Sequence, residues 1–225
     1  MPMPKTIAMI PARMGSQRLI KKNLRELDGV PLITRAIRKC KSAACFDEIW
    51  VNSEDKEFAS IAAQEDVGFH NRPQELGDNN TTSEQFVTEF LSHHDCEYIF
   101  QVHSITPLLT TDEVVAFTNA FVTSGHDVML SAIPDQIEVA YKGQPVNFTF
   151  DEKTNSQDLT PVHRVTWSIT GWKRNAFLEA VAKGKCATYS GSIGFFPVNS
   201  MAGHAIKTEV DLSIAQAYLN VMKAR

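Results

Sequence analysis

The feature that most constrains the fold is the alternation of short apolar segments with longer amphipathic ones. Segments of strand length cover residues 6–11, 48–52, 67–70, 97–103 and 127–132. Helix-like segments between them cover residues 31–44, 56–65, 81–92 and 111–124. Such alternation is typical of βαβ units. The sequence therefore predicts an α/β fold of Rossmann-like type, in which helices flank a mostly parallel sheet.

This rhythm changes after residue 134. Residues 138–142 and 146–150 predict an antiparallel hairpin around Gly143-Gln144. A strand over 164–170, a helix over 175–182, a strand over 193–198 and a helix over 209–223 follow. We expect a single domain over residues 1–225, with residues 135–165 as an inserted hairpin. Its alternating apolar residues must be covered, and a second subunit is one way to do so, which suggests a homodimer.

Composition excludes several classes of partner. The formal net charge is −4, with 43% hydrophobic and 21% charged residues, which does not favour a general nucleic-acid or membrane surface. The four cysteines form no C-x-x-C pair, so we expect free thiols in a reducing compartment. The apolar run over 7–10 is too short for a signal peptide, and these features predict a cytoplasmic protein.

The loop after the first predicted strand carries the most information. Residues 10–24 read IPARMGSQRLIKKNL and include the cations Arg13, Arg18, Lys21 and Lys22. Gly15 and Ser16 allow backbone amides to approach an anion. Open parallel sheets bind ligands at this edge, so the loop favours polyphosphate binding. The alternative is a solvated loop with scattered basic residues. A dehydrogenase is disfavoured because G-x-G-x-x-G is absent, and the P-loop pattern is absent too.

The same loop resembles the signature I-P-A-R-G-G-S-K-G-I-P-G-K-N-L of the acylneuraminate cytidylyltransferases. The matching positions are Ile10, Pro11, Ala12, Arg13, Gly15, Ser16, Lys22, Asn23 and Leu24. Arg18-Leu19 is similar to the S-x-R-L of the related 3-deoxy-octulosonate enzymes. Weaker matches follow in order at residues 51–55, 72–83, 105–108 and 155–162. The resemblance implies a fold of the nucleotide-diphospho-sugar transferase type. It also implies transfer of CMP from CTP to the anomeric hydroxyl of a 2-keto sugar acid, with release of pyrophosphate.

The resemblance also implies roles for individual residues. Catalytic contacts to the triphosphate are expected from Arg13 and Lys22, with Lys207 as a further candidate. Nucleotide binding is expected from Ala12, Gly15, Ser16, Asn23, Arg72 and Ser83. Substrate contacts are expected from Thr106, Gln157 and Asp158, and the last two could reach the substrate across a subunit boundary. His103 joins this group because it ends a predicted strand at the ligand edge.

Each role has a structural alternative. Arg13 and Lys22 could be loop cations, Arg72 a surface turn residue and Asp158 a cap or turn residue. His103 could be a satisfied polar residue at a strand end. His93-His94 ends a predicted helix, where a cation suits the helix dipole, and we assign it no chemistry.

The C-terminal motif departs from the family pattern. The two aspartates that hold a divalent metal in D-I-D-T-E-x-D-L are Ala205 and Lys207 here. Asp211 remains, but its spacing from Thr208 indicates a helix cap rather than a metal ligand. We expect Mg²⁺ to arrive with CTP, or Lys207 to supply the positive charge instead. The ending also resembles that of the methylerythritol-phosphate cytidylyltransferases, whose lysine approaches the substrate phosphate.

These departures keep two other functions open. The loss of the metal aspartates favours a non-catalytic homologue that retains nucleotide binding. Thr166-Trp167 replaces an asparagine-glycine pair of the sugar-acid pocket, which favours a nucleotidyltransferase for another acceptor. Trp167 could equally be a core residue.

Overall fold

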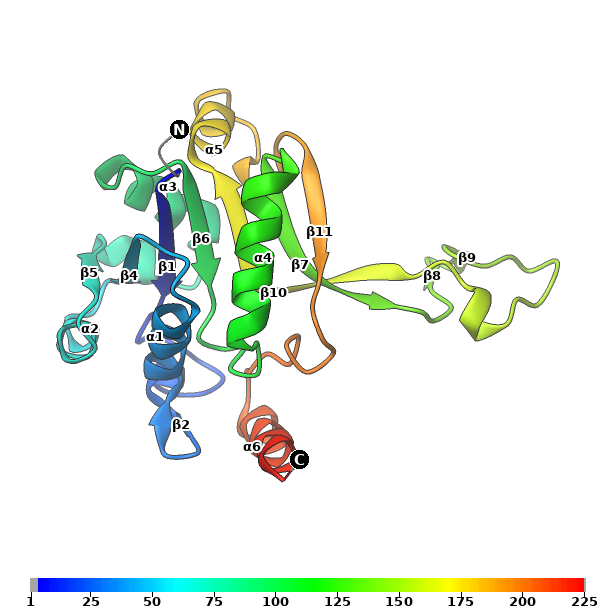
Figure 1. The fold of residues 1–225 in the computed structure, drawn as a ribbon, viewed down its shortest axis with the longest axis horizontal. Helices are drawn as coiled ribbons and strands as arrows, with labels where there is room; N and C mark the ends of the chain where they lie inside the picture. The colour runs from blue at the N-terminus through cyan, green and yellow to red at the C-terminus, as the bar shows by residue number, and fades with distance from the viewer. Residues whose placement is uncertain (1–3, 225) are drawn as a thin grey trace.

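The computed structural model describes residues 4–224 and has a seven-stranded sheet at its centre (Figure 1). The strand order is β11-β7-β10-β6-β1-β4-β5, and β10 alone runs antiparallel to its neighbours. The bounds are β1 Thr6–Pro11, β4 Glu48–Ser53, β5 Gly68–Asn71, β6 Tyr98–Val102, β7 Val128–Asp135, β10 Val162–Lys173 and β11 Ile193–Pro197. The predicted mostly parallel α/β sheet is confirmed.

Helices cover both faces of this sheet, because most strands alternate with a helix that buries one apolar stripe. One face packs on α1 (Leu32–Ala43), α2 (Glu57–Gln64) and α4 (Thr111–Ser124). The other face packs on α3 (Ser83–His93) and α5 (Arg174–Ala182). The last helix, α6 (Glu209–Lys223), joins a smaller apolar cluster that includes Leu19, Leu27 and Leu108. No described helix is both long and apolar enough to cross a membrane.

The shorter elements lie in the connections. They are the 3₁₀ helices Lys22–Leu24, Gln74–Gly77, Ser156–Asp158 and Ala187–Tyr189, and the two-residue strands β2 (Glu26–Leu27) and β3 (Val30–Pro31). Pro31 caps α1 in an extended conformation, so the helix begins one residue later than predicted. All four cysteines are free thiols, and Cys40 and Cys96 are buried.

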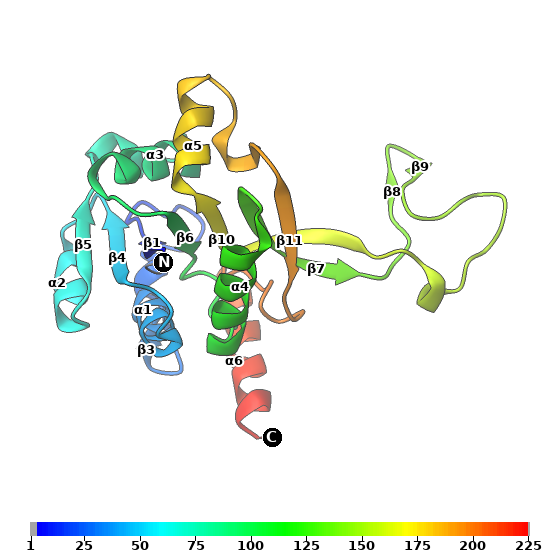
Figure 2. The same ribbon diagram turned by 45° about the horizontal axis from the view of Figure 1, so that its top comes forward.

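The segment between β7 and β10 forms an arm, residues 136–161, that projects from the body (Figures 1 and 2). Its hairpin is shorter than predicted, with strands β8 (Ala140–Tyr141) and β9 (Gln144–Pro145). The predicted turn was one residue too late. Lys142 and Gly143 form it, with φ of 50° and 77°, which is the conformation that a two-residue hairpin requires.

Candidate functional site

A cavity of about 160 Å³ lies at the carboxyl ends of β1 and β6. The loop after each strand contributes to it, as does the loop after β5 and helix α3. Its lining residues are Pro11, Ala12, Arg13, Lys22, Asn23, Arg72, Phe86, His103 and Ile105. Five of the predicted catalytic or nucleotide-binding residues and the predicted contact His103 therefore meet at one place.

Asn23 fixes the shape of the basic loop. Its amide nitrogen donates to the Arg13 carbonyl over 3.0 Å, and its amide oxygen accepts from the Ser104 hydroxyl over 2.8 Å. The side chain is buried, so these two bonds are shielded from water. Asn23 thus ties the loop after β1 to the loop after β6. The Arg13 guanidinium is held by a 2.8 Å hydrogen bond that its Nη1 donates to the Asp78 carbonyl.

The electrostatics of the cavity centre on Lys22. Burial lowers its pKa, and Arg18, Arg13 and Lys207 lower it further. Every charged neighbour that shifts this pKa is a cation, which indicates that positive groups gather around the ammonium group. Lys21, the next residue in the chain, instead turns outward to Glu57 at 3.4 Å. The cation cluster consists of Arg13, Arg18, Lys22 and Lys207.

Arg72 and Glu54 form a buried ion pair beside the cavity. The two residues follow β5 and β4, neighbouring parallel strands whose Asn71 and Ser53 are in register. Arg72 Nη2 lies 2.7 Å from Glu54 Oε2 and also donates to the Ala12 carbonyl over 2.9 Å. Burial lowers the Arg72 pKa despite this partner. Its guanidinium stands 5.0 Å from the centre of the Phe86 ring.

Glu54 also positions the start of the basic loop, because its Oε1 accepts from the Met14 amide over 3.1 Å. Sequence reasoning did not single out Glu54 or Phe86 as site residues. Glu54 could have been found from its place directly after a predicted strand. Phe86 carried no such signal, because an inward aromatic residue on a helix usually indicates core.

His103 is neutral at pH 7 because burial and the nearby Lys22 lower its pKa to about 4. Its Nε2 lies 2.6 Å from the Gln101 side-chain amide. A neutral imidazole can exchange hydrogen bonds with a ligand without adding charge to the cluster. Thr106 does not line the cavity. It is buried, and its hydroxyl donates to the His103 carbonyl over 3.0 Å, which closes the turn after β6.

The remaining predicted residues lie outside the cavity lining. Gly15 and Ser16 belong to the basic loop, where Gly15 is exposed and a Cβ would meet no atom within 4 Å. Ser83 begins α3, one turn before Phe86. Gln157 and Asp158 are exposed residues of the arm, where the Gln157 carbonyl accepts from the Gln136 side chain. Within one chain they are not brought to the cavity.

The C-terminal motif reaches the cation cluster through Lys207. The Ile206 amide donates to the Ile105 carbonyl over 2.7 Å, which places this segment beside the cavity. Asp211 closes a capping box: its Oδ2 accepts from the Thr208 amide, the Thr208 hydroxyl and the Lys207 amide. The capping interpretation of Asp211 is consistent with these bonds. With Ala205 and Lys207 at the two metal positions, these residues do not fit a protein-held Mg²⁺.

The Thr166-Trp167 replacement forms part of a bulge in β10. Trp167 has φ of 58°, a conformation that favours glycine and is strained for a bulky residue. Its ring packs edge-on against Tyr189 at 6.0 Å and does not line the cavity. The Thr166 hydroxyl joins a buried network with Ser131 and Ser168.

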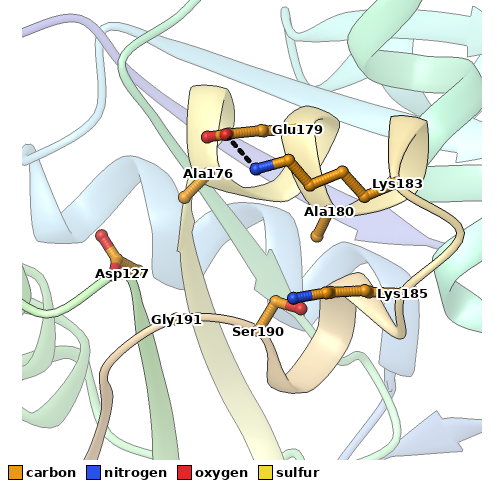
Figure 3. Close-up of a pocket in the computed structure, with 8 residues that line it drawn as sticks. All are labelled: Asp127, Ala176, Glu179, Ala180, Lys183, Lys185, Ser190 and Gly191. Carbon is orange, nitrogen blue, oxygen red and sulfur yellow. Dashed lines mark hydrogen bonds and ion pairs between the residues drawn. The ribbon is translucent and has the colours of Figure 1, made fainter.

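A second cavity, of about 240 Å³, lies at the opposite ends of the strands, beside α5 (Figure 3). Its two carboxylates and Lys183 are already partnered, and Lys185 is the remaining charged residue of the lining. Glu179 pairs with Lys183, and Asp127 accepts from the Ser192 amide and hydroxyl. Because the amino ends of parallel strands are not where such sheets bind ligands, we place the site at the first cavity.

The sequence was also compared with known proteins. The sequence model of the cytidylyltransferase family matches residues 7–178. N-acylneuraminate cytidylyltransferase A of Danio rerio is 28% identical over 165 residues, which cover 72% of this chain but 38% of that protein. Pseudaminic acid cytidylyltransferase of Campylobacter jejuni is 27% identical over 188 residues, covering 78% of this chain and 81% of the relative.

Solved structures share the fold over almost the whole chain. A CMP:2-keto-3-deoxy-manno-octonic acid synthetase complexed with CTP has a TM-score of 0.72 at 16% identity and covers 97% of this chain. The 4-diphosphocytidyl-2C-methyl-D-erythritol synthase of Anaerococcus prevotii has a TM-score of 0.71 at 15% identity. Each match covers 99% of the solved chain, which supports the α/β architecture independently of the motifs.

Proposed function

The chain belongs to the cytidylyltransferase family, and we propose that it transfers CMP from CTP to the anomeric hydroxyl of a 2-keto sugar acid. The names of its relatives, an N-acylneuraminate and a pseudaminic acid cytidylyltransferase, support this acceptor class. In the reaction, the acceptor oxygen forms a bond to the α-phosphorus. At the same time, the bond breaks between the α-phosphorus and the oxygen that bridges it to the β-phosphate. Pyrophosphate leaves, and the hydroxyl proton passes to a base.

The observation that carries the proposal is the cation cluster at the carboxyl edge of the sheet. Lys22 is held there partly buried among three other cations. Such an arrangement disfavours the charged form of Lys22 until an anion binds. A triphosphate supplies several negative charges along one chain, which suits cations contributed by separate segments. As pyrophosphate leaves, Arg13 and Lys22 would stabilise its growing charge.

The nucleoside end would lie toward Arg72 and Phe86. The Glu54 ion pair and the Ala12 carbonyl hold the Arg72 guanidinium in one orientation. Phe86 offers an apolar face to a base, and the fixed guanidinium offers directed donors to its edge. Asn23 holds the loop in shape, and Ser83 begins the helix that carries Phe86.

The sugar-acid pocket would be completed by a second subunit. Gln157 and Asp158 lie on the projecting arm, which also exposes apolar side chains at Ile137, Tyr141, Val146 and Phe150. An exposed apolar arm favours association with another copy. In a homodimer the arm would carry Gln157 and Asp158 to the partner's cavity, where they would bind the acceptor.

The charge that a metal supplies in relatives would come at least partly from Lys207. We expect any Mg²⁺ to arrive with CTP and to be held by phosphate oxygens and water. Lys207→Ala would then reduce turnover strongly. Strict Mg²⁺ dependence together with full activity of Lys207→Ala would contradict this role.

Pyrophosphate release from CTP, measured with eight- and nine-carbon 2-keto sugar acids, tests the function. We expect release with one of these acceptors, and no comparable release from ATP, GTP or UTP. Lys22→Met should weaken CTP binding about tenfold or more, because one charge-assisted contact is lost. Lys21→Met is the matched control, since Lys21 faces Glu57, and it should leave CTP binding unchanged. Equal effects of the two substitutions would refute the assignment.

Ala205 and Lys207 also favour a second function, that of a non-catalytic nucleotide-binding homologue. In that case CTP would raise the melting temperature of the protein, as any ligand of the native state does. No acceptor would then release pyrophosphate. The same assay therefore separates the two functions.

A further inference from the structure

A cluster of three histidines and one glutamate lies apart from the lining of the cavity, between strand β5 and helix α3. His70 is on β5, Glu89 and His93 are one helical turn apart on α3, and His94 ends that helix. Donor atoms of His70, Glu89 and His93 all lie within 4.8 Å of one another. We propose that these three residues bind a transition-metal ion of the Zn²⁺ class.

The geometry of the three donors supports a single ion. His70 Nε2 lies 2.7 Å from one oxygen of Glu89, and His93 Nδ1 lies 3.3 Å from the other. Ligand bonds of about 2.0–2.2 Å in a tetrahedral site place donor atoms roughly 3.3 Å apart. Metal binding would therefore require the His93 ring to exchange its 3.0 Å contacts with the Glu89 carbonyl and the Ser92 hydroxyl for the ion. Glu89 and His93 share one face of α3 because they are four residues apart. This spacing places both side chains where they can bind the same ion.

The chemistry of the donor set selects the metal. Two imidazoles and one carboxylate suit Zn²⁺, Co²⁺ or Ni²⁺, whereas Mg²⁺ and Ca²⁺ prefer oxygen ligands alone. His93 is the exposed member, at 61%, and leaves the site open to solvent for entry of the ion and for a water ligand. His70 is nearly buried, which limits the rotations available to its ring.

His94 acts as a positioning residue for His70. Its Nε2 lies 3.0 Å from His70 Nδ1, the ring nitrogen that points away from Glu89. The His94 ring is itself fixed between Phe90, stacked at 4.0 Å, and Trp50, at 4.2 Å. A histidine ligand commonly has its second nitrogen held in this way, because the contact sets the ring orientation.

Metal binding here would join β5 to α3. These elements continue to Arg72, two residues after His70, and carry Phe86, one turn before Glu89. Both of those side chains line the cavity. The ion would therefore stabilise the wall of the site without contacting it.

Zn²⁺ titration of the tag-free, full-length protein against a chromophoric chelator tests the proposal. We expect saturation at one ion per chain that excess Mg²⁺ does not displace. His93→Ala, a change at an exposed residue, should weaken binding at least about tenfold, as should Glu89→Gln. His163→Ala is the matched control, because His163 is exposed and stacks on Phe195 away from the cluster. It should leave the affinity unchanged.

Co²⁺ substitution identifies the ligands independently. Nitrogen and oxygen ligation gives visible d–d bands without a thiolate charge-transfer band, and His93→Ala should abolish them. A thiolate band would assign the ion to a cysteine and overturn the proposal. Absence of saturable binding, or equal affinity in His93→Ala and the wild type, would overturn it as well. None of these readouts depends on turnover of CTP.

Discussion

Removing the charge of Glu54 should destabilise the protein more than its single hydrogen bond to Met14 would predict. The side chains of Glu54 and Arg72 are 4% and 2% exposed, and their closest atoms lie 2.7 Å apart. At an effective dielectric constant of about 20, Coulomb attraction at that distance is roughly 6 kcal/mol. Desolvation offsets much of it, but Glu54→Gln leaves the Arg72 charge buried without its hydrogen-bonded carboxylate. We expect the free energy of unfolding to fall by about 3 kcal/mol.

Urea denaturation followed by circular dichroism measures this change. Glu57→Gln is the matched control, because its ion pair with Lys21 is exposed, and it should cost less than about 1 kcal/mol. The double variant Glu54→Met/Arg72→Met should recover most of the loss, since no charge then remains buried. If Glu54→Gln and Glu57→Gln proved equally mild, the buried pair would not have the role assigned to it.

Three further predictions concern other parts of the molecule. His103 has a folded-state pKa of about 4, below its unfolded value, so its contribution to stability is present above pH 6.5 and is lost toward pH 4. The free energy of unfolding, measured by urea denaturation, should therefore fall between pH 7 and pH 5. His103→Gln should reduce the slope of that fall by up to about 1.4 kcal/mol per pH unit. Gly171→Ala would place a Cβ 2.5 Å from the Phe121 ring and should cost about 1–3 kcal/mol, measured by thermal unfolding; an unchanged melting temperature would contradict this packing. Replacing the exposed arm residues Tyr141 and Phe150 with aspartate should shift a dimer to monomer in sedimentation velocity, and an unchanged sedimentation coefficient would count against the arm as the interface.

Much of the fold follows from local patterns. Helices α4 and α6 begin at the predicted residues because each starts with a capping box that can be recognised in the sequence. The pairs are Thr110 with Glu113 and Thr208 with Asp211. The hairpin turn was misplaced by one residue, because Lys142-Gly143 and Gly143-Gln144 are both acceptable turn pairs. Register with the flanking strands decided between them.

The sequence alone determined the βα alternation, the basic loop after the first strand and the family to which the chain belongs. Each of these features depends on residues that lie close together along the chain. Only the tertiary structure decided that Lys207 joins Lys22 while Lys21 turns away, and that Glu54 neutralises Arg72. It also brought His70 to Glu89 and His93. Those partners are distant in sequence, and their contacts arise from strand order and helix packing, which local periodicity does not encode.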